Sequence, residues 1–193
     1  MRRIPAAYFF VVAYTVWMKR IVKKKFFDRA APIVARELLG KTLVREVRGK
    51  RIASMITEVE AYDGPHDRAS HAHRGKTPRN EAMFGPAGNW YVYLVYGMHE
   101  MLNIVTGPVG YPAAVLIRGT HDVVGPGKLT KYFKITRTQN KTIAASKSGL
   151  WIEDHGVRVL ARQVMRTPRI GVSYAGEVWA GKKYRFVLKK GRE

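Results

Sequence analysis

Short stretches in which apolar and polar residues alternate dominate this chain, and a period of two is typical of half-buried β-strands. The pattern predicts strands over residues 42–47, 52–60, 90–96, 101–106, 113–118, 157–164 and 183–188. Helical spacing is rarer: it predicts a short helix over residues 32–39, closed by Gly40, and a weakly helical basic segment over residues 132–145. Many hairpins and few helices predict an α+β fold around an antiparallel sheet.

Two of the predicted hairpins carry polar chemistry. The first joins residues 42–47 to 52–60 and brings Glu60 to the loop that follows. The second turns at Gly97 and connects residues 90–96 to 101–106. Strand alternation places Glu58, Glu60 and Tyr62 on one face, so that carboxylates and an aromatic ring project side by side. The plainer alternative is that both glutamates are solvated and paired with some of the many lysines and arginines.

Four aromatic residues lie within seven positions at the start of the second hairpin: Trp90, Tyr91, Tyr93 and Tyr96. Such a run is typical of a core strand. Tyr93 and Tyr96 are three positions apart, so they point to opposite faces of a regular strand. Because the chain is strongly basic, outward-facing aromatic side chains also fit a surface on which nucleic-acid bases stack.

Composition narrows the classes of partner. The 193 residues hold 35 Lys and Arg against 14 Asp and Glu, a formal net charge of +21. Such a field favours a polyanion, either nucleic acid or an anionic membrane surface, and charge alone does not choose between them. The absence of cysteine excludes disulfides and thiolate metal sites and is compatible with a cytoplasmic location. The length predicts one domain with its own core.

The N-terminal segment differs from the rest of the chain. Residues 4–18 form an apolar run of 15 residues, with basic residues on both sides. A spanning helix needs about 20 such residues, so we expect no membrane span, and no small-residue signal-peptide cleavage site precedes the lysines. We interpret residues 1–25 as an extension of a domain formed by residues 26–193, with translation beginning at Met18. A membrane-associated segment is the alternative.

A series of ordered motifs gives the chain a family resemblance. The motifs are E-V-E-A-Y-D-G-P (58–65), S-H-A-H-R-G-K-T-P-R-N (70–80), M-F-G-P-A-G (83–88), Y-V-Y-L-V-Y-G-M-H (91–99), L-N-I-V (102–105), V-L-I-R (115–118), G-P-G-K-L (125–129), R-I-G-V-S-Y-A-G-E (169–177) and Y-R-F (184–186). Over about residues 26–188 they resemble the alkyladenine (3-methyladenine) DNA glycosylase family, the human-type methylpurine glycosylases.

The resemblance implies a single domain around a curved antiparallel sheet with a protruding hairpin and a few short helices. It implies a monofunctional glycosylase of base excision repair that acts on double-stranded DNA as a monomer, without a cofactor or an obligatory protein partner. The implied substrates are alkylated or deaminated purines, namely 3-methyladenine, 7-methylguanine, hypoxanthine and ethenoadenine.

A base stacked in a duplex is out of reach, so a glycosylase must first rotate the nucleotide out of the helix. By resemblance, Tyr96 is the wedge that fills the gap, and Tyr62 and Tyr93 stack on the extruded base. An alkylated purine carries a positive charge, and its attraction to aromatic faces is worth about 0.5–2 kcal/mol.

By the same resemblance, Glu60 is the general base that takes a proton from the water attacking C1′ and stabilises the charge developing on the sugar. Arg118 helps to place this water, and its charge would keep Glu60 ionised. The backbone carbonyl of Ile170 is a further contact of the water. Because water and not lysine is the nucleophile, we expect no Schiff base and no strand cleavage.

The remaining matched residues are expected to select the base and hold the DNA. His71 closes the pocket and contacts the base edge. Asn103 crowds the exocyclic amine of normal guanine, with a purely structural asparagine as the alternative. Four further residues are expected beside the DNA: Arg79, Met83, Gly127 and Lys128. The last two lie in G-P-G-K-L (125–129), which resembles a helix start whose free amides could hold a phosphate, with a plain loop-to-helix junction as the alternative.

No metal site is predicted, because His66, Asp67 and His73 match no standard spacing of metal ligands. Only six residues separate Arg118 from Gly125, where family members commonly carry a longer insertion, so some DNA-backbone contacts are expected to be missing. Three other functions stay open: a non-catalytic basic nucleic-acid-binding protein, a membrane-surface protein, and a family member that binds damaged bases without excising them.

Overall fold

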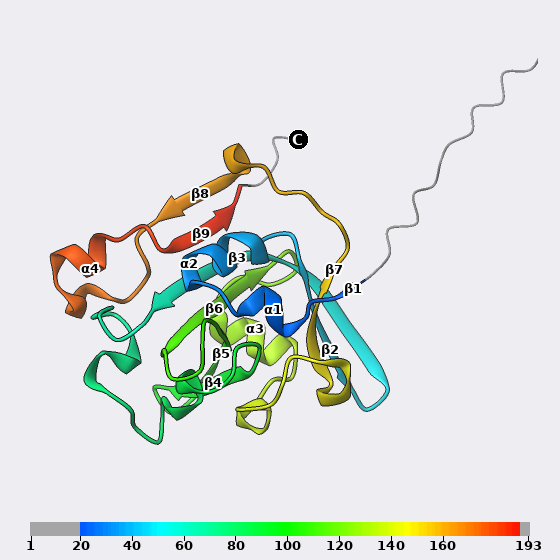
Figure 1. The fold of residues 1–193 in the computed structure, drawn as a ribbon. Helices are drawn as coiled ribbons and strands as arrows, with labels where there is room; N and C mark the ends of the chain where they lie inside the picture. The colour runs from blue at the N-terminus through cyan, green and yellow to red at the C-terminus, as the bar shows by residue number, and fades with distance from the viewer. Residues whose placement is uncertain (1–19, 190–193) are drawn as a thin grey trace, which may run out of the picture.

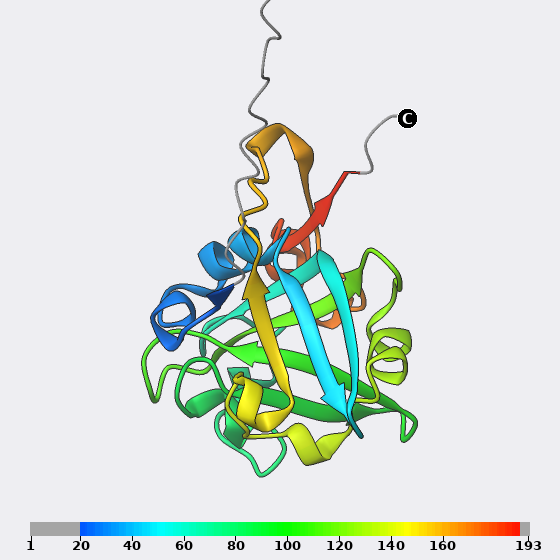
Figure 2. The ribbon, with the colours of Figure 1, turned by 90° about the vertical axis from the view of Figure 1, so that its right-hand side faces the viewer.

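A computed structural model of the chain describes residues 20–189, and one large antiparallel sheet runs through this part. The strands follow the order β1-β7-β2-β3-β6-β5-β4, and β9 pairs with both β3 and β8. The sheet does not close into a barrel. Short helices lie around it (Figure 1), and β7, β2 and β3 run side by side across one view of the molecule (Figure 2).

The strands are β1 (Arg20–Ile21), β2 (Thr42–Val47), β3 (Lys50–Asp63), β4 (Trp90–Val95), β5 (His99–Val105), β6 (Ala113–Thr120), β7 (Leu150–Asp154), β8 (Val164–Thr167) and β9 (Arg185–Leu188). The α-helices are α1 (Lys24–Phe27), α2 (Ala31–Leu38), α3 (Pro126–Tyr132) and α4 (Glu177–Gly181). Single 3₁₀ turns connect several of them, including η1 (His71–Arg74) and η6 (Ser173–Ala175).

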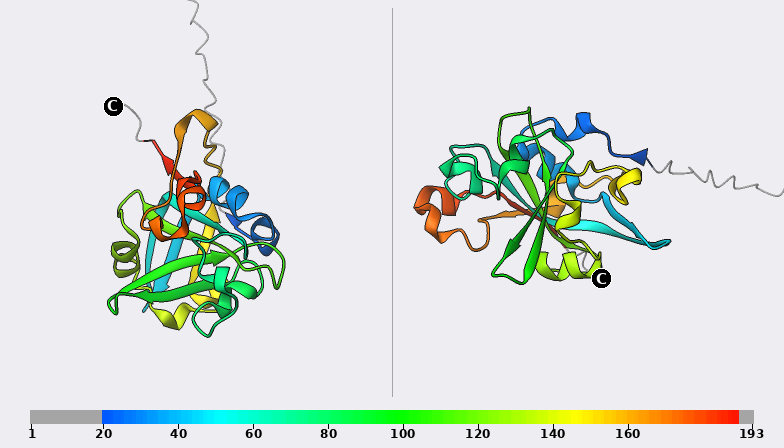
Figure 3. Two further views of the ribbon diagram at one scale, coloured as in Figure 1. Left: turned by 90° about the vertical axis from the view of Figure 1, so that its left-hand side faces the viewer. Right: turned by 90° about the horizontal axis from the view of Figure 1, so that it is seen from below.

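The 14-residue strand β3 joins the two halves of the sheet. Its first half pairs with β2, and this hairpin extends from the body in the right-hand view of Figure 3. Its second half lies between β6 and β9. The register shifts on both sides of Glu58, and such a bulge bends a strand and redirects its side chains. As a result, Glu58 and Glu60 can be reached by side chains from both neighbouring strands.

Helix α2 covers the sheet at β3 and β6 (Figure 1). Pro32 lies in its first turn, and the chain leaves the helix before Gly40, whose φ of 84° suits a glycine. Val34, Ala35 and Leu38 are fully buried in the main hydrophobic core. Burying a side chain such as Leu38 contributes about 1.5–3 kcal/mol, so this face fixes the helix to the sheet.

The predicted α+β fold is confirmed, and so are both hairpins and the helix beginning near residue 32. The helix predicted over residues 132–145 is wrong, because α3 ends at Tyr132. The following segment instead supports strand β4: Asn140 Oδ1 accepts from the N–H of Val92, and Lys141 N–H donates to the carbonyl of Trp90. These contacts outweigh a weak helical propensity.

The strand predicted over residues 157–164 is also wrong, since the strand that follows this segment, β8, begins only at Val164. Strand β7 was missed, although it pairs with β2 and places Leu150 and Ile152 in the core. A five-residue strand that ends in charged residues gives little periodic signal.

The extension predicted for residues 1–25 is only partly described. Arg20–Ile21 pairs with β7, and Phe27 is buried in the core. The apolar run at residues 4–18 lies outside the described residues, and the domain boundary at residue 26 stays a prediction. Between residues 20 and 189, no helix has both the length and the apolar character needed to cross a membrane.

Candidate active site

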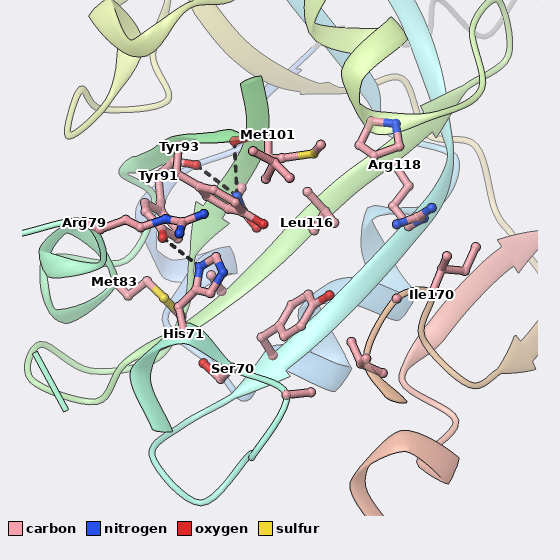
Figure 4. A pocket seen from close by; sticks show the side chains of 18 of the residues that line it. Ser70, His71, Arg79, Met83, Tyr91, Tyr93, Met101, Leu116, Arg118 and Ile170 are labelled. Atoms are coloured by element: carbon pink, nitrogen blue, oxygen red, sulfur yellow. Dashed lines mark hydrogen bonds between the residues drawn. The ribbon is translucent and has the colours of Figure 1, made fainter. Parts of the chain in front are cut away.

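A cavity of about 400 Å³ opens between β3, β6, the β4–β5 hairpin and the loops around η1 and η6. This volume suits a small organic ligand. Figure 4 shows Arg118 and Ile170 on one side of it, across from His71, Tyr91 and Tyr93. The predicted site residues that line the cavity are Tyr62, His71, Arg79, Met83, Tyr93, Tyr96, Asn103, Arg118 and Ile170.

Glu60 lies directly behind this lining and is 0 % exposed. Its Oε1 accepts a hydrogen bond of 2.8 Å from the backbone N–H of Ile170, and its Oε2 accepts one of 2.9 Å from the hydroxyl of Tyr62. Nη1 of Arg118 is 3.4 Å from the same Oε2. All three partners line the cavity. The carboxylate is therefore separated from the cavity by one layer of polar groups.

Two opposing effects set the basicity of Glu60. Burial raises its pKa above the ordinary value for a glutamate, while the charge of Arg118 and the hydrogen bonds from Ile170 and Tyr62 lower it. Arg118 does favour the ionised form, as expected, but desolvation outweighs it. A carboxylate with a raised pKa is a stronger base once ionised, which suits proton abstraction near neutral pH.

Sequence reasoning missed that Glu58 binds two arginines. Nε of Arg118 donates to Oε1 of Glu58 at 2.9 Å, and Nε of Arg185 donates to the same oxygen at 2.7 Å. The strand pattern did place Glu58 on the face of Glu60. Nothing in the sequence showed that Arg185, 127 residues further along, would join it.

The opposite wall is aromatic. Tyr93 stacks on Tyr91 with ring centroids 5.0 Å apart, and the ring of His71 stands edge-on to Tyr93 at 4.6 Å. Nδ1 of His71 is 3.0 Å from the hydroxyl of Tyr91, a contact that sequence reasoning missed. Although His71 is partly open to solvent, desolvation of its ring, together with the charge of Arg79, lowers its pKa to about 4. His71 is therefore neutral at neutral pH.

A buried ion pair behind Tyr62 fixes the loop that carries Ile170. Nη2 of Arg169 donates to Oδ1 of Asp67 at 2.8 Å, and both side chains are 0 % exposed. The guanidinium also lies 4.8 Å from the ring centroid of Tyr62 and donates to the carbonyl of Ala61. Asp67 is thus bound to Arg169, and within residues 20–189 no group of three or more acidic or histidine side chains could hold a metal ion.

Tyr96 stands at the tip of the β4–β5 hairpin and at the mouth of the cavity. Its side chain is 87 % exposed, and its φ of 51° lies in the left-handed region. Few non-glycine residues adopt this conformation, which concentrates at functional sites. Intercalation of this ring into DNA stays a prediction.

Two predicted contacts lie deeper than expected, and a third is exposed. Asn103 is 3 % exposed, and its Nδ2 donates to the carbonyls of Tyr91 and Met101, so it braces the hairpin while lining the cavity. Met83 is 2 % exposed and forms cavity wall rather than outer surface. Arg79 is exposed, and its guanidinium lies 5.2 Å from the ring centroid of Tyr93. Contact between these last two side chains and DNA stays a prediction.

Gly127 and Lys128 do not line the cavity but lie in the first turn of α3, next to Pro126, which does. A Cβ at Gly127 would meet the His99 ring at 3.1 Å, so glycine lets α3 pack closely on β5. Lys128 is exposed, two residues after Pro126. Phosphate contacts by this turn stay a prediction.

Comparison with known proteins adds evidence independent of the geometry. The profile of the methylpurine-DNA glycosylase (MPG) family matches residues 25–125 and 119–192. The chain belongs to the methylpurine-DNA glycosylase family. A Myxococcus xanthus protein named "Putative 3-methyladenine DNA glycosylase" is 46% identical over 175 residues, which cover 86% of this chain and 89% of that protein. A Methanocella arvoryzae protein of the same name is 44% identical over 177 residues, covering 81% and 87%.

Membership of the methylpurine-DNA glycosylase family confirms the resemblance that the motifs indicated, and with it the prediction of a DNA glycosylase acting on DNA. The motifs that carried the resemblance surround the cavity: its walls come from the segments at residues 58–65, 70–80, 91–99, 115–118 and 169–177. The family motifs and the cavity therefore identify the same part of the fold.

Proposed function

We propose that this protein is a monofunctional DNA glycosylase that hydrolyses the N-glycosidic bond of alkylated or deaminated purines with a water activated by Glu60. The observation that carries the proposal is the setting of Glu60 behind the cavity, with Arg118 at 3.4 Å and a backbone N–H on its other oxygen. The water oxygen bonds to C1′ as the bond to the base breaks, and the bonding electron pair leaves with the base. Glu60 accepts the proton of the water.

Water must reach the carboxylate for this reaction. In this structure both oxygens of Glu60 accept hydrogen bonds, from the Tyr62 hydroxyl and from the N–H of Ile170. Because the buried pair of Arg169 and Asp67 fixes the loop that carries Ile170, we expect the Tyr62 hydroxyl to be the group that moves, releasing Oε2 when a nucleotide enters.

The aromatic faces of the cavity suit a planar base. Each of the proposed stacking rings already contacts a planar group: Arg79 lies against Tyr93, and Arg169 against Tyr62. An alkylated purine is likewise planar, and its positive charge makes it a good leaving group. No strong general acid is then required. Neutral lesions such as hypoxanthine and ethenoadenine need further contacts to the base edge, which we assign to His71 and Asn103.

We assign the contacts with DNA to residues around the rim of the cavity. Tyr96 enters the duplex where the nucleotide has left, and the first turn of α3 with Lys128 holds a backbone phosphate. A formal net charge of +21 supplies long-range attraction. Every group in this scheme comes from one chain, so we propose that a monomer is sufficient.

A panel of duplex oligonucleotides tests the proposal, each with one lesion: 7-methylguanine, 3-methyladenine, hypoxanthine or ethenoadenine. We expect release of the free base from at least the cationic lesions and an abasic strand that breaks only after alkali is added. Strand cleavage before alkali would show a lyase, and retention of every base with tight lesion binding would show a protein that only binds damage.

A further inference from the structure

Arg118 is shared between two glutamates. Its Nε donates to Glu58 Oε1 at 2.9 Å, while its Nη1 stays 3.4 Å from Glu60 Oε2. The side chain of Arg118 is 13% exposed and that of Glu58 8%, so water screens these charges poorly. The shorter and better aligned contact is thus to Glu58, which the proposed reaction does not use.

Glu58 is itself fixed from a third strand. Nε of Arg185 on β9 donates to Glu58 Oε1 at 2.7 Å, and Nη1 of Arg185 donates to Thr167 Oγ1 on β8 at 3.1 Å. The two arginines and the two glutamates balance in charge, which makes the group tolerable in a largely buried place. Strands β3, β6, β8 and β9 therefore meet at one carboxylate.

An arginine without a competing partner binds a nearby carboxylate tightly, through two parallel hydrogen bonds of about 2.7–2.9 Å. Such a contact between Arg118 and Glu60 would occupy the oxygens that must receive the proton of water. It would also stabilise the ionised form and weaken it as a base. The Nε contact to Glu58 keeps one edge of the guanidinium away from Glu60.

We propose that Glu58 is a positioning residue, which holds Arg118 beside Glu60 and so leaves Glu60 open to water and basic enough to accept a proton. The inference rests on the proposed role of Glu60. It assigns Glu58 no contact with the substrate.

Removing the charge of Glu58 should change the pKa of Glu60 in one direction. The charged or titratable groups that face Glu60 are Glu58 and Tyr62 on its own strand, Arg118 on β6, Tyr93 on β4, Arg169 on the loop before η6, Tyr174 on η6 and Arg185 on β9. A neutral residue at position 58 removes a nearby negative charge and frees Arg118 to close on Glu60. Both changes favour ionised Glu60, so its pKa falls.

The test is the pH profile of single-turnover excision of 7-methylguanine, whose departure needs no acid. For Glu58→Gln we expect the plateau rate to fall about tenfold to a hundredfold, the range for a lost hydrogen bond to a charged group. We also expect the acidic limb to move to lower pH. Arg118→Gln should move the same limb to higher pH, because it removes the cation instead.

Glu153→Gln is the matched control, since Glu153 is a buried carboxylate that binds Arg51 on β3 and lies outside the cavity lining. It should leave the acidic limb at the wild-type pH. If Glu58→Gln does not fold, Glu58→Asp keeps the charge but reaches less far, and it should lower the plateau and move the limb in the same direction by less.

A wild-type plateau and limb in these position-58 variants, or a lower plateau with an unmoved limb, would overturn the inference. The variant Glu60→Gln distinguishes a failure of the inference about Glu58 from a failure of the proposed function. If Glu60→Gln is inactive while the position-58 variants behave as wild type, only the positioning role is wrong. If Glu60→Gln excises normally, the general-base assignment itself fails.

Discussion

Burying the acid of this site destabilises the fold. Glu60 is a fully buried acid whose desolvation outweighs its favourable partners. The strand pattern placed it on one face with Glu58 and Tyr62, and the family resemblance singled it out. The resemblance implied a role for the carbonyl of Ile170, but the hydrogen bond from its N–H to Glu60 was not foreseen, because the two residues are 110 positions apart and meet only through tertiary folding.

Replacing Glu60 by Gln should stabilise the protein at neutral pH. The pKa of Glu60 is raised in the folded state, so the folded protein holds a proton at a pH where the unfolded chain has released it. Stability therefore falls as the pH rises from the pKa of the unfolded chain through that of the folded protein. Gln does not titrate. Urea unfolding at pH 4 and pH 8 should show an advantage for Glu60→Gln that is larger at pH 8, and an advantage that shrinks at pH 8 would contradict the raised pKa.

His71 should not contribute to the pH dependence of excision near neutrality. Its pKa of about 4 leaves the ring neutral above pH 5, with its Nδ1 on the Tyr91 hydroxyl. We expect His71→Gln to lower the excision rate of 7-methylguanine without moving the acidic limb of the pH profile. A limb that moves between pH 5 and 7 in this variant would mean that the ring titrates there.

At the scale of elements, the β4–β5 hairpin shows what sequence patterns predict well and what they miss. Alternating apolar residues and Gly97 were sufficient for the hairpin and its turn. The supporting segment after α3 was predicted as a helix, because its contacts with β4 are backbone and amide hydrogen bonds that leave no periodic signal. Strand β7 was missed for a related reason, since five residues are too few to show a period.

The hairpin tip gives a prediction that separates stability from function. Tyr96 has a φ of 51°, where a non-glycine residue costs about 1–2 kcal/mol, and Asn tolerates this conformation better. Tyr96→Asn should unfold at an equal or higher urea concentration. Excision from duplex DNA should fall about tenfold, an amount set by the stacking of one base, while excision from a single strand changes little.

Val92→Ala serves as the control for Tyr96→Asn, because Val92 is a buried residue of strand β4, which leads to Tyr96, and does not line the cavity. It should lower stability and affect duplex and single-stranded substrates alike. Equal losses on both substrates for Tyr96→Asn would exclude a wedge role.

The whole molecule is strongly basic, and its fold class followed from the patterning and ordered motifs of the sequence. What the sequence did not reveal is how β9 returns to β3 and closes the site from behind, since this depends on pairing between residues about 125 positions apart. The charge, in contrast, was visible from composition alone, and its consequence concerns binding rather than fold.

We expect lesion binding to weaken steeply with salt, and Lys128→Ala to reduce the slope of log K against log salt by about one, because one phosphate contact is lost. Lys50→Ala is the control: it removes an equal charge at the start of β3, ten strand residues or on the order of 30 Å from Glu60. Its slope should match that of the wild type. Equal slopes for both variants would remove Lys128 from the DNA interface.

The most direct test compares Glu60→Gln with the wild type on a duplex that carries one 7-methylguanine, measuring base release and lesion binding on the same samples. Glu46→Gln is the control, since Glu46 is an exposed glutamate on β2. We predict that Glu60→Gln releases the base at least about 100-fold more slowly, as for a lost general base, while binding persists and Glu46→Gln stays fully active. Base release by Glu60→Gln at the wild-type rate would contradict the account.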